Sequence, residues 1–158
     1  MPTPAVLSLG SNVGDRNYHL RTALYRVGRI MRLVRISSVW ETDPVDCPRG
    51  ASPFLNLVCA GTTTMTAHEL LDEMQSIEKR MGRLRTVRNA PRQIDIDLIF
   101  YGGMRLRTSS LVVPHPRYSE REFVLSPLRE LNLGWFDTLA GLPVDALRGS
   151  GAVRKATP

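Results

Sequence analysis

The chain has 158 residues, of which 42% are hydrophobic and 23% charged. That length fits one domain spanning residues 1–158, and the apolar fraction is too high for a disordered chain. No apolar run approaches the ~20 residues of a membrane span, and the N-terminus lacks the layout of a signal peptide. The two cysteines, Cys47 and Cys59, are too few for a disulfide scaffold, so we expect a protein of the reducing cytoplasm. Because no apolar run is long enough to span a membrane, we also expect no membrane partner.

The charge balance is basic, with 21 Lys and Arg against 15 Asp and Glu and a net charge of +6. Such a balance indicates an anionic partner, either a nucleic acid or a phosphorylated small molecule, unless arginine is simply abundant throughout. The excess is local, because residues 76–92 hold six cations against one acid, Glu78, a net charge of +5. The six cations are Lys79, Arg80, Arg83, Arg85, Arg88 and Arg92.

The first third of the chain predicts a strand, a helix and a second strand. Residues 5–9 are an apolar run that ends in a glycine-rich turn, where Asp15 can cap a helix whose apolar positions continue to Met31. Residues 33–40 are rich in β-branched side chains and predict one strand. Residues 43–53 contain three prolines and predict a loop longer than the usual ~4–6 residues, a length often associated with function.

The middle of the chain repeats this pattern. Residues 54–63 predict a strand, and residues 66–81 predict a helix that begins with a capping box. A basic loop over residues 83–91 leads into a strand at residues 94–101. Residues 111–113 are a candidate short strand.

The sequence after these elements predicts a short helix and a C-terminal tail. Ser126 and Pro127 favour the start of a short helix, and the tail from Gly149 is expected to fray because it has few apolar residues. The element order is β-α-β-β-α-β followed by these additions. It predicts an α+β, ferredoxin-like sandwich with helices on one face of an antiparallel sheet.

The sharpest local signal is a pair of carboxylates on the strand at residues 94–101. Alternation places Asp95 and Asp97 on one face, roughly 6.6–6.8 Å apart along the strand. Two such carboxylates repel each other unless a cation lies between them, and Mg²⁺ is held by one or two carboxylates with phosphates and water. The alternative is a solvated polar face. The opposite face carries four apolar residues, Ile94, Ile96, Leu98 and Phe100.

The basic loop before this strand carries forked donors that suit phosphate oxygens, at Arg83, Arg85, Arg88 and Arg92. A metal site next to arginines is what phosphoryl transfer requires. The alternative is a solvated charged loop. No G-x-x-x-x-G-K-[ST] motif is present, so a Walker-type phosphate loop is excluded.

Four further residues carry possible binding groups. His115 lies between two prolines that restrict its backbone, and it suits either a phosphate contact or a solvated turn. Phe54, Asn56 and Phe123 suit either an aromatic slot with an amide group or core packing.

Seven segments together carry a resemblance to a known family. In order they are LGSNVGD (9–15), WETDP (40–44), FLN (54–56), IEKRMGR (77–83), APRQIDIDL (90–98), VPHP (113–116) and REFVLSPL (121–128). From about residue 5 to 131 the chain resembles the 6-hydroxymethyl-7,8-dihydropterin pyrophosphokinases of folate synthesis. No single segment is diagnostic, but all of them in register are specific.

The resemblance implies transfer of the β,γ-pyrophosphoryl group of ATP to the hydroxymethyl oxygen of the pterin, which leaves AMP. It implies two Mg²⁺ ions held by Asp95 and Asp97, and a monomeric protein. The implied catalytic residues are Arg83, Arg92, Asp95 and Asp97. The implied ATP-binding residues are Leu71, Gln75, Glu78, Arg83, Arg85, Arg92, His115 and Arg121. The implied pterin-binding residues are Thr42, Pro44, Val45, Phe54, Asn56 and Phe123.

Two alternatives remain at this point. One is a nucleic-acid-binding module on a ferredoxin-like sheet, although paired carboxylates would repel a phosphate backbone and no aromatic pattern marks a central strand. The other is a two-metal nucleotidyltransferase, which would release pyrophosphate instead of AMP. We expect the small-molecule substrates, ATP and a pterin, and no nucleic acid.

Overall fold

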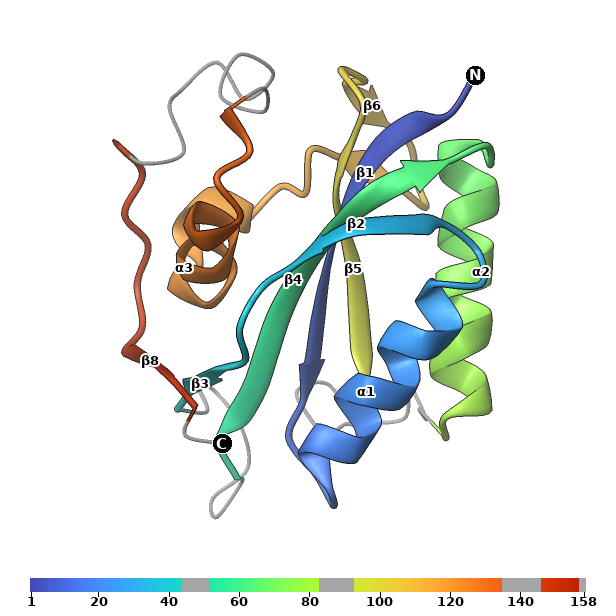
Figure 1. Ribbon diagram of the computed structural model, residues 1–158. Helices are drawn as coiled ribbons and strands as arrows, with labels where there is room; N and C mark the ends of the chain where they lie inside the picture. Colours follow the sequence, from blue (N-terminus) through green and yellow to red (C-terminus); the bar gives the residue numbers. More distant parts are fainter. Residues whose placement is uncertain (44–51, 83–92, 135–145, 157–158) are drawn as a thin grey trace.

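The computed structural model describes residues 1–43, 52–82, 93–134 and 146–156 (Figure 1). In chain order the elements are β1 (Thr3–Ser11), α1 (Arg16–Val27), β2 (Arg32–Ile36), β3 (Trp40–Thr42), β4 (Phe54–Thr63), α2 (Ala67–Arg80), β5 (Asp95–Tyr101), β6 (Leu106–Arg107), β7 (Val112–Val113), η1 (Tyr118–Glu120), α3 (Glu122–Leu131) and β8 (Val153–Lys155). With β2 and β3 counted as one strand, the elements up to β5 follow the expected order β-α-β-β-α-β, and α3 and β8 are among the additions that follow.

The main sheet has the order β5-β1-β4-β3-β8, with β2 also paired to β4, and every pair is antiparallel. If β2 and β3 are taken as one interrupted strand, the order is that of a ferredoxin-like sheet. The predicted fold class is therefore confirmed. A separate two-stranded ribbon joins β6 to β7.

Two cores lie on opposite faces of the sheet. On β4, Leu55 and Leu57 belong to the core under α1 and α2, whereas Val58 and Ala60 belong to the core under α3. Figure 1 shows α1 and α2 on one side of the sheet and α3 on the other. The alternation expected for this strand is confirmed, and α3 covers the face that the ferredoxin-like pattern leaves open.

Both long helices begin at the predicted caps. The Asp15 carboxylate accepts a hydrogen bond from the backbone N–H of Tyr18, and Thr66 and Glu69 form a reciprocal capping box. After α2, Gly82 has a φ of +87°, which a residue with a side chain rarely adopts. It therefore ends the helix where the sequence predicts.

The single strand expected at residues 33–40 is instead two strands. The Ser37 hydroxyl accepts from the backbone N–H of Val58, and the Ser37 N–H donates to the Val58 carbonyl, each at 2.9 Å. The Ser37 hydroxyl therefore replaces a backbone carbonyl as the acceptor for Val58, and the chain bends between β2 and β3. The bend sets β3 beside the start of β4.

The expectation that Phe100 shares a face with Ile96 and Leu98 is wrong. The register between β1 and β5 shifts at Ile99, so that Phe100 pairs with Val6 and lies in the α3 core. The ring of Phe100 packs edge-on against Tyr118, with centroids 4.9 Å apart. The bulge leaves the orientation of Asp95 and Asp97 unchanged.

The C-terminal part differs from the sequence prediction in two ways. Helix α3 begins at Glu122, four residues before Ser126, because apolar residues at helical spacing reach back to Val124 and Leu125 and bury one face. The tail expected to fray from Gly149 contains β8, which pairs with β3. An edge strand of this length is held by main-chain bonds and needs little apolar content.

Among the described residues, no helix has both the length and the apolar character needed to cross a membrane. The free thiol of Cys59 is buried in the core under α1 and α2, and burial raises its pKa to about 12.

Candidate functional site

Asp95 and Asp97 lie on the α3 face of the edge strand β5. They pair with Gly10 and Ser8 of β1, while Ile96 between them is buried in the core under α1 and α2. Both aspartates are half-buried. The structure thus brings the two carboxylates to one face, as the alternation predicts.

An arginine and a histidine lie within electrostatic range of these carboxylates. Arg121 precedes α3, and burial lowers its pKa, although Asp97 and Asp95 favour the charged form. Burial also lowers the pKa of His115 to about 4, with a further lowering by the Arg121 charge that outweighs the opposite effect of Asp95. The site therefore combines two carboxylates, a guanidinium and a neutral imidazole.

The His115 ring has a defined orientation. Its backbone N–H donates to the carbonyl of Ile99 at 2.9 Å, and its Nδ1 accepts from the backbone N–H of Arg117 at 3.1 Å. Because Nδ1 accepts, the neutral ring carries its proton on Nε2. The imidazole is therefore a hydrogen-bond donor through Nε2.

Across the sheet from Asp95, one row of residues brings a buried amide onto the same face. Asn56 of β4 pairs with Gly10, is 3% exposed, and its Nδ2 donates to the Thr42 hydroxyl at 3.2 Å. A Cβ on Gly10 would lie 2.9 Å from Asn56 Oδ1 and 3.5 Å from a ring carbon of Phe54. The absence of a side chain at Gly10 lets both residues lie close over β1.

The two phenylalanines proposed to contact a ring lie on this side of the sheet. Phe54 shares a strand face with Asn56, and Phe123 packs against the core under α3. The guanidinium of Arg121 lies 5.5 Å from the centroid of the Phe123 ring. Both phenylalanines are only half-buried.

Helix α2 contributes unequally to the site. Leu71 packs partly against the core and Gln75 is exposed, whereas Glu78 is 3% exposed. The Oε2 atom of Glu78 accepts from the backbone N–H of Ile96 at 3.2 Å. Glu78 therefore contacts β5 between the two aspartates, a contact that no sequence pattern indicated.

Gly10 is the other residue whose role the sequence reasoning missed. A signal was present, since a glycine within a strand often marks a close approach by a neighbour. The apolar run over residues 5–9 instead places Gly10 in the turn after the first strand.

Several predicted site residues lie outside the described residues: Pro44, Val45, Arg83, Arg85, Arg88 and Arg92.

Within the ranges that the structure describes, no group of three or more His, Cys, Asp or Glu side chains could hold a metal. The pair Asp95 and Asp97 nevertheless fits Mg²⁺, because this ion takes oxygen ligands from one or two carboxylates and the rest from substrate phosphates and water.

Comparison with known proteins gives one consistent result. Residues 6–133 match the model of the 7,8-dihydro-6-hydroxymethylpterin-pyrophosphokinase family. The chain is 42% identical over 129 residues to the 2-amino-4-hydroxy-6-hydroxymethyldihydropteridine pyrophosphokinase of Bacillus subtilis, covering 80% of this chain and 77% of that protein. It is also 42% identical over 134 residues to a mitochondrial folate synthesis bifunctional protein of Arabidopsis thaliana, covering 80% of this chain and 23% of that protein.

Solved structures show the same fold. A crystal structure of Plasmodium falciparum HPPK-DHPS superposes with a TM-score of 0.72 at 16% identity, covering 92% of this chain and 43% of that one. The chain thus spans most of the bacterial relative and less than half of the longer proteins.

Proposed function

The chain belongs to the 7,8-dihydro-6-hydroxymethylpterin-pyrophosphokinase family, and we propose that it carries out pyrophosphoryl transfer on the α3 face of its sheet. Membership makes it an ATP-dependent pyrophosphotransferase of folate synthesis. The observation that supports this location is the gathering of Asp95, Asp97, His115 and Arg121 on the face that also carries Asn56.

In the reaction, the hydroxymethyl oxygen of the pterin forms a bond to the β phosphorus of ATP. The bond from that phosphorus to the oxygen of the α phosphate breaks, AMP leaves, and the hydroxyl proton is lost. Negative charge increases on the oxygens around the β phosphorus, so the site must supply positive charge and donors there.

We assign the metal site to the two aspartates of β5. Asp95 and Asp97 present oxygen ligands of the type that Mg²⁺ prefers, and we propose two ions. When bound, Mg²⁺ neutralises phosphate charge and stabilises the attacking and leaving oxygens.

The cationic and donor groups bind the triphosphate. His115 donates through Nε2 to a phosphate oxygen, and Arg121 supplies a fixed charge beside the carboxylates. Arg83, Arg85 and Arg92 are proposed to bind the triphosphate as well, with Arg83 and Arg92 acting in catalysis. The nucleotide site is proposed to extend around the edge strand β5 to α2 on the other face of the sheet, where Leu71, Gln75 and Glu78 line it.

The pterin is proposed to lie beside the phosphates, between Phe54 and Phe123, with the amide of Asn56 at its polar edge. Thr42 orients that amide through the hydrogen bond to Asn56 Nδ2. Pro44 and Val45 are proposed to complete the pocket.

The decisive experiment incubates the protein with ATP, Mg²⁺ and 6-hydroxymethyl-7,8-dihydropterin and separates the products by chromatography. Release of AMP in proportion to pterin diphosphate is expected. Release of pyrophosphate instead would identify a nucleotidyltransferase and contradict the proposal.

The aspartates provide the residue-level test. Asp95→Ala or Asp97→Ala is expected to lower kcat by about 10³-fold or more, because several kcal/mol of charge stabilisation is lost with the metal. Asp72→Ala, which removes an exposed carboxylate from α2, is the matched control and should retain activity. Wild-type turnover in either site variant would refute the metal assignment.

We further propose a monomer in the cytoplasm that binds no nucleic acid. Light scattering of the purified chain tests the monomer, and a salt-sensitive RNA complex would contradict the last point.

A further inference from the structure

The C-terminal segment, residues 146–156, contacts both walls of the proposed pterin site, although it lies beyond residues 6–133 that match the family model. Figure 1 shows it running from the α3 side of the molecule to β3. Its two ends make separate sets of contacts.

At the first end, the backbone of Gly149 and Ser150 lies against the residues that begin α3. Ser150 N–H donates to the carbonyl of Glu120 at 2.9 Å, and the N–H of Glu122 donates to the carbonyl of Ser150 at 3.3 Å. A Cβ on Gly149 would lie 2.6 Å from the Glu122 nitrogen, so only glycine permits this approach. The side chain of the N-cap residue Arg121 makes no capping hydrogen bond. The carbonyl of Ser150 in the C-terminal segment instead accepts from the N–H of Glu122, at the start of the helix.

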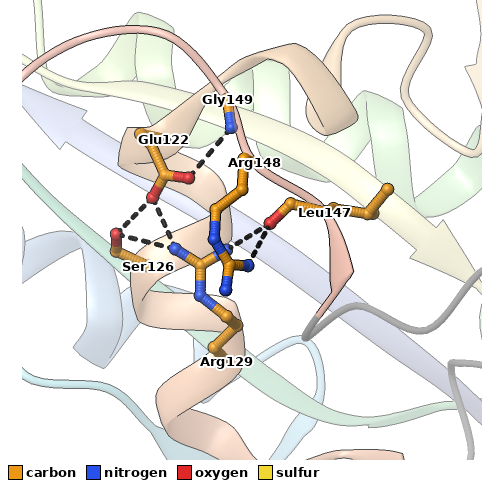
Figure 2. A network of polar contacts seen from close by, with 6 residues as sticks. All are labelled: Glu122, Ser126, Arg129, Leu147, Arg148 and Gly149. Carbon is orange, nitrogen blue, oxygen red and sulfur yellow. Dashed lines mark hydrogen bonds and ion pairs between the residues drawn. The ribbon is translucent and has the colours of Figure 1, made fainter.

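The Glu122 carboxylate extends this contact into a network (Figure 2). Its Oε1 accepts from Gly149 N–H at 2.9 Å, and its Oε2 accepts from Ser126 and Arg129, each at 2.6 Å. Arg129 also donates to the carbonyl of Leu147 at 3.0 Å. Burial alone would raise the pKa of Glu122, but these hydrogen bonds lower it below its usual value. Glu122 is therefore a charged residue held in place by hydrogen bonds. Its neighbours in the sequence, Arg121 and Phe123, are both residues of the proposed site.

At the second end, β8 pairs with β3 in a register that joins Val153 to Thr42. The N–H of Ala156 donates to the carbonyl of Val39 at 2.9 Å, and Arg154 reaches Glu41 at 3.0 Å. The ion pair is exposed and contributes little, so the main-chain ladder with β8 holds β3 on the side that does not pair with β4. This strand carries Thr42, which orients Asn56.

We propose that the C-terminal segment is a positioning element of the pterin site, joined to α3 through the positioning residue Glu122. It fixes the start of α3, which carries Arg121 and Phe123, and it fixes β3, which carries Thr42. This inference rests on the proposed function. No residue of the segment needs to touch the substrate.

The test uses point variants of the full chain, with Kd for the pterin and KM and kcat for both substrates. Glu122→Ala and Gly149→Ala are expected to raise the pterin Kd about tenfold or more, because small displacements of binding groups are costly. Glu122→Gln keeps one acceptor oxygen, which can serve either Gly149 or the Ser126 and Arg129 side, and should restore part of the affinity.

Two controls separate positioning from general damage. Glu120→Ala removes a neighbouring carboxylate whose ion pair with Arg117 is exposed, and it should leave the pterin Kd unchanged. Thr66→Ala removes the cap of α2 and should lower thermal stability without changing the pterin Kd.

The outcomes are distinguishable. If wild type is active but Glu122→Ala and Gly149→Ala bind pterin normally, the positioning role is refuted and the proposed function stands. If wild type releases no AMP with the pterin, both are refuted. If Glu122→Ala does not fold, Gly149→Ala and Glu122→Gln still decide.

Discussion

At the scale of single residues, the site depends on a glycine at position 10. Gly10 sits between Asp95 on one neighbouring strand and Asn56 on the other. Any larger residue would meet the Asn56 amide, so this position fixes how closely the amide approaches β1.

Gly10→Ala is therefore expected to weaken pterin binding about tenfold, since displacing a packed group costs about 1–3 kcal/mol. Calorimetry with the pterin measures this. Gly28→Ala is the matched control, because its Cβ would make only ordinary contacts at 3.4 Å or more and its φ of −63° suits any residue. Equal losses in the two variants would contradict the argument.

His115 carries a pH prediction. Its folded pKa of about 4 lies below the ordinary 6.5, so the unfolded chain binds a proton first as the pH falls. The contribution of neutral His115 to the free energy of unfolding is therefore fully present above pH 6.5 and is lost as the pH falls toward 4.

Nitrogen NMR of the ring across pH 4–8 should show a neutral imidazole protonated on Nε2 down to about pH 5. Urea unfolding of wild type and His115→Asn at each pH isolates the contribution to stability. A midpoint near 6.5 in the folded protein would show that burial of the ring does not control its charge.

At the scale of elements, the edge strand β5 is held by a helix. Strand β5 lies at the edge of the sheet and therefore has a partner strand on one side only. The carboxylate of the buried Glu78 in α2 accepts a hydrogen bond from the N–H of Ile96 in this strand. The helix thereby fixes the strand between its two aspartates.

Glu78→Ala is expected to lower the free energy of unfolding by about 1–3 kcal/mol, because a buried N–H loses its acceptor, and to lower kcat as well. Glu78→Gln keeps an acceptor oxygen and should lose less stability. Denaturant unfolding and steady-state rates measure both effects. If the stability of Glu78→Ala matched that of Asp72→Ala on the exposed face, the contact would have no structural role.

The elements also show the limits of sequence patterns. Alternation along β4 and the caps of α1 and α2 follow from neighbouring residues and were predicted correctly. The bulge at Ile99 and the break at Ser37 were not, because each depends on a partner strand that is distant in the sequence.

At the scale of the whole molecule, the positive charge is unevenly distributed. Residues 76–92 carry most of the excess in the sequence and adjoin the strand of the two aspartates. The proposed pterin contacts, in contrast, are aromatic and amide groups.

Salt should therefore separate the two substrates. Raising the ionic strength from about 0.05 to 0.5 M is expected to weaken ATP binding several-fold, because exposed charges are screened, and to leave the pterin Kd nearly unchanged. Calorimetric titrations with a non-hydrolysable ATP analogue and with the pterin measure both. A parallel loss for the pterin would contradict this division of the site.

Local patterns in the sequence predict the β-α-β-β-α-β order, the shared face of Asp95 and Asp97, and the family, because periodicity, caps and ordered motifs involve neighbouring residues. They do not predict that Glu78 contacts Ile96, that Gly10 accommodates Asn56, or that the residues from Gly149 onward contact the start of α3 and β3. These contacts join residues up to more than a hundred positions apart, as between Glu41 and Arg154. Only the packing of the folded chain decides which distant backbone groups meet.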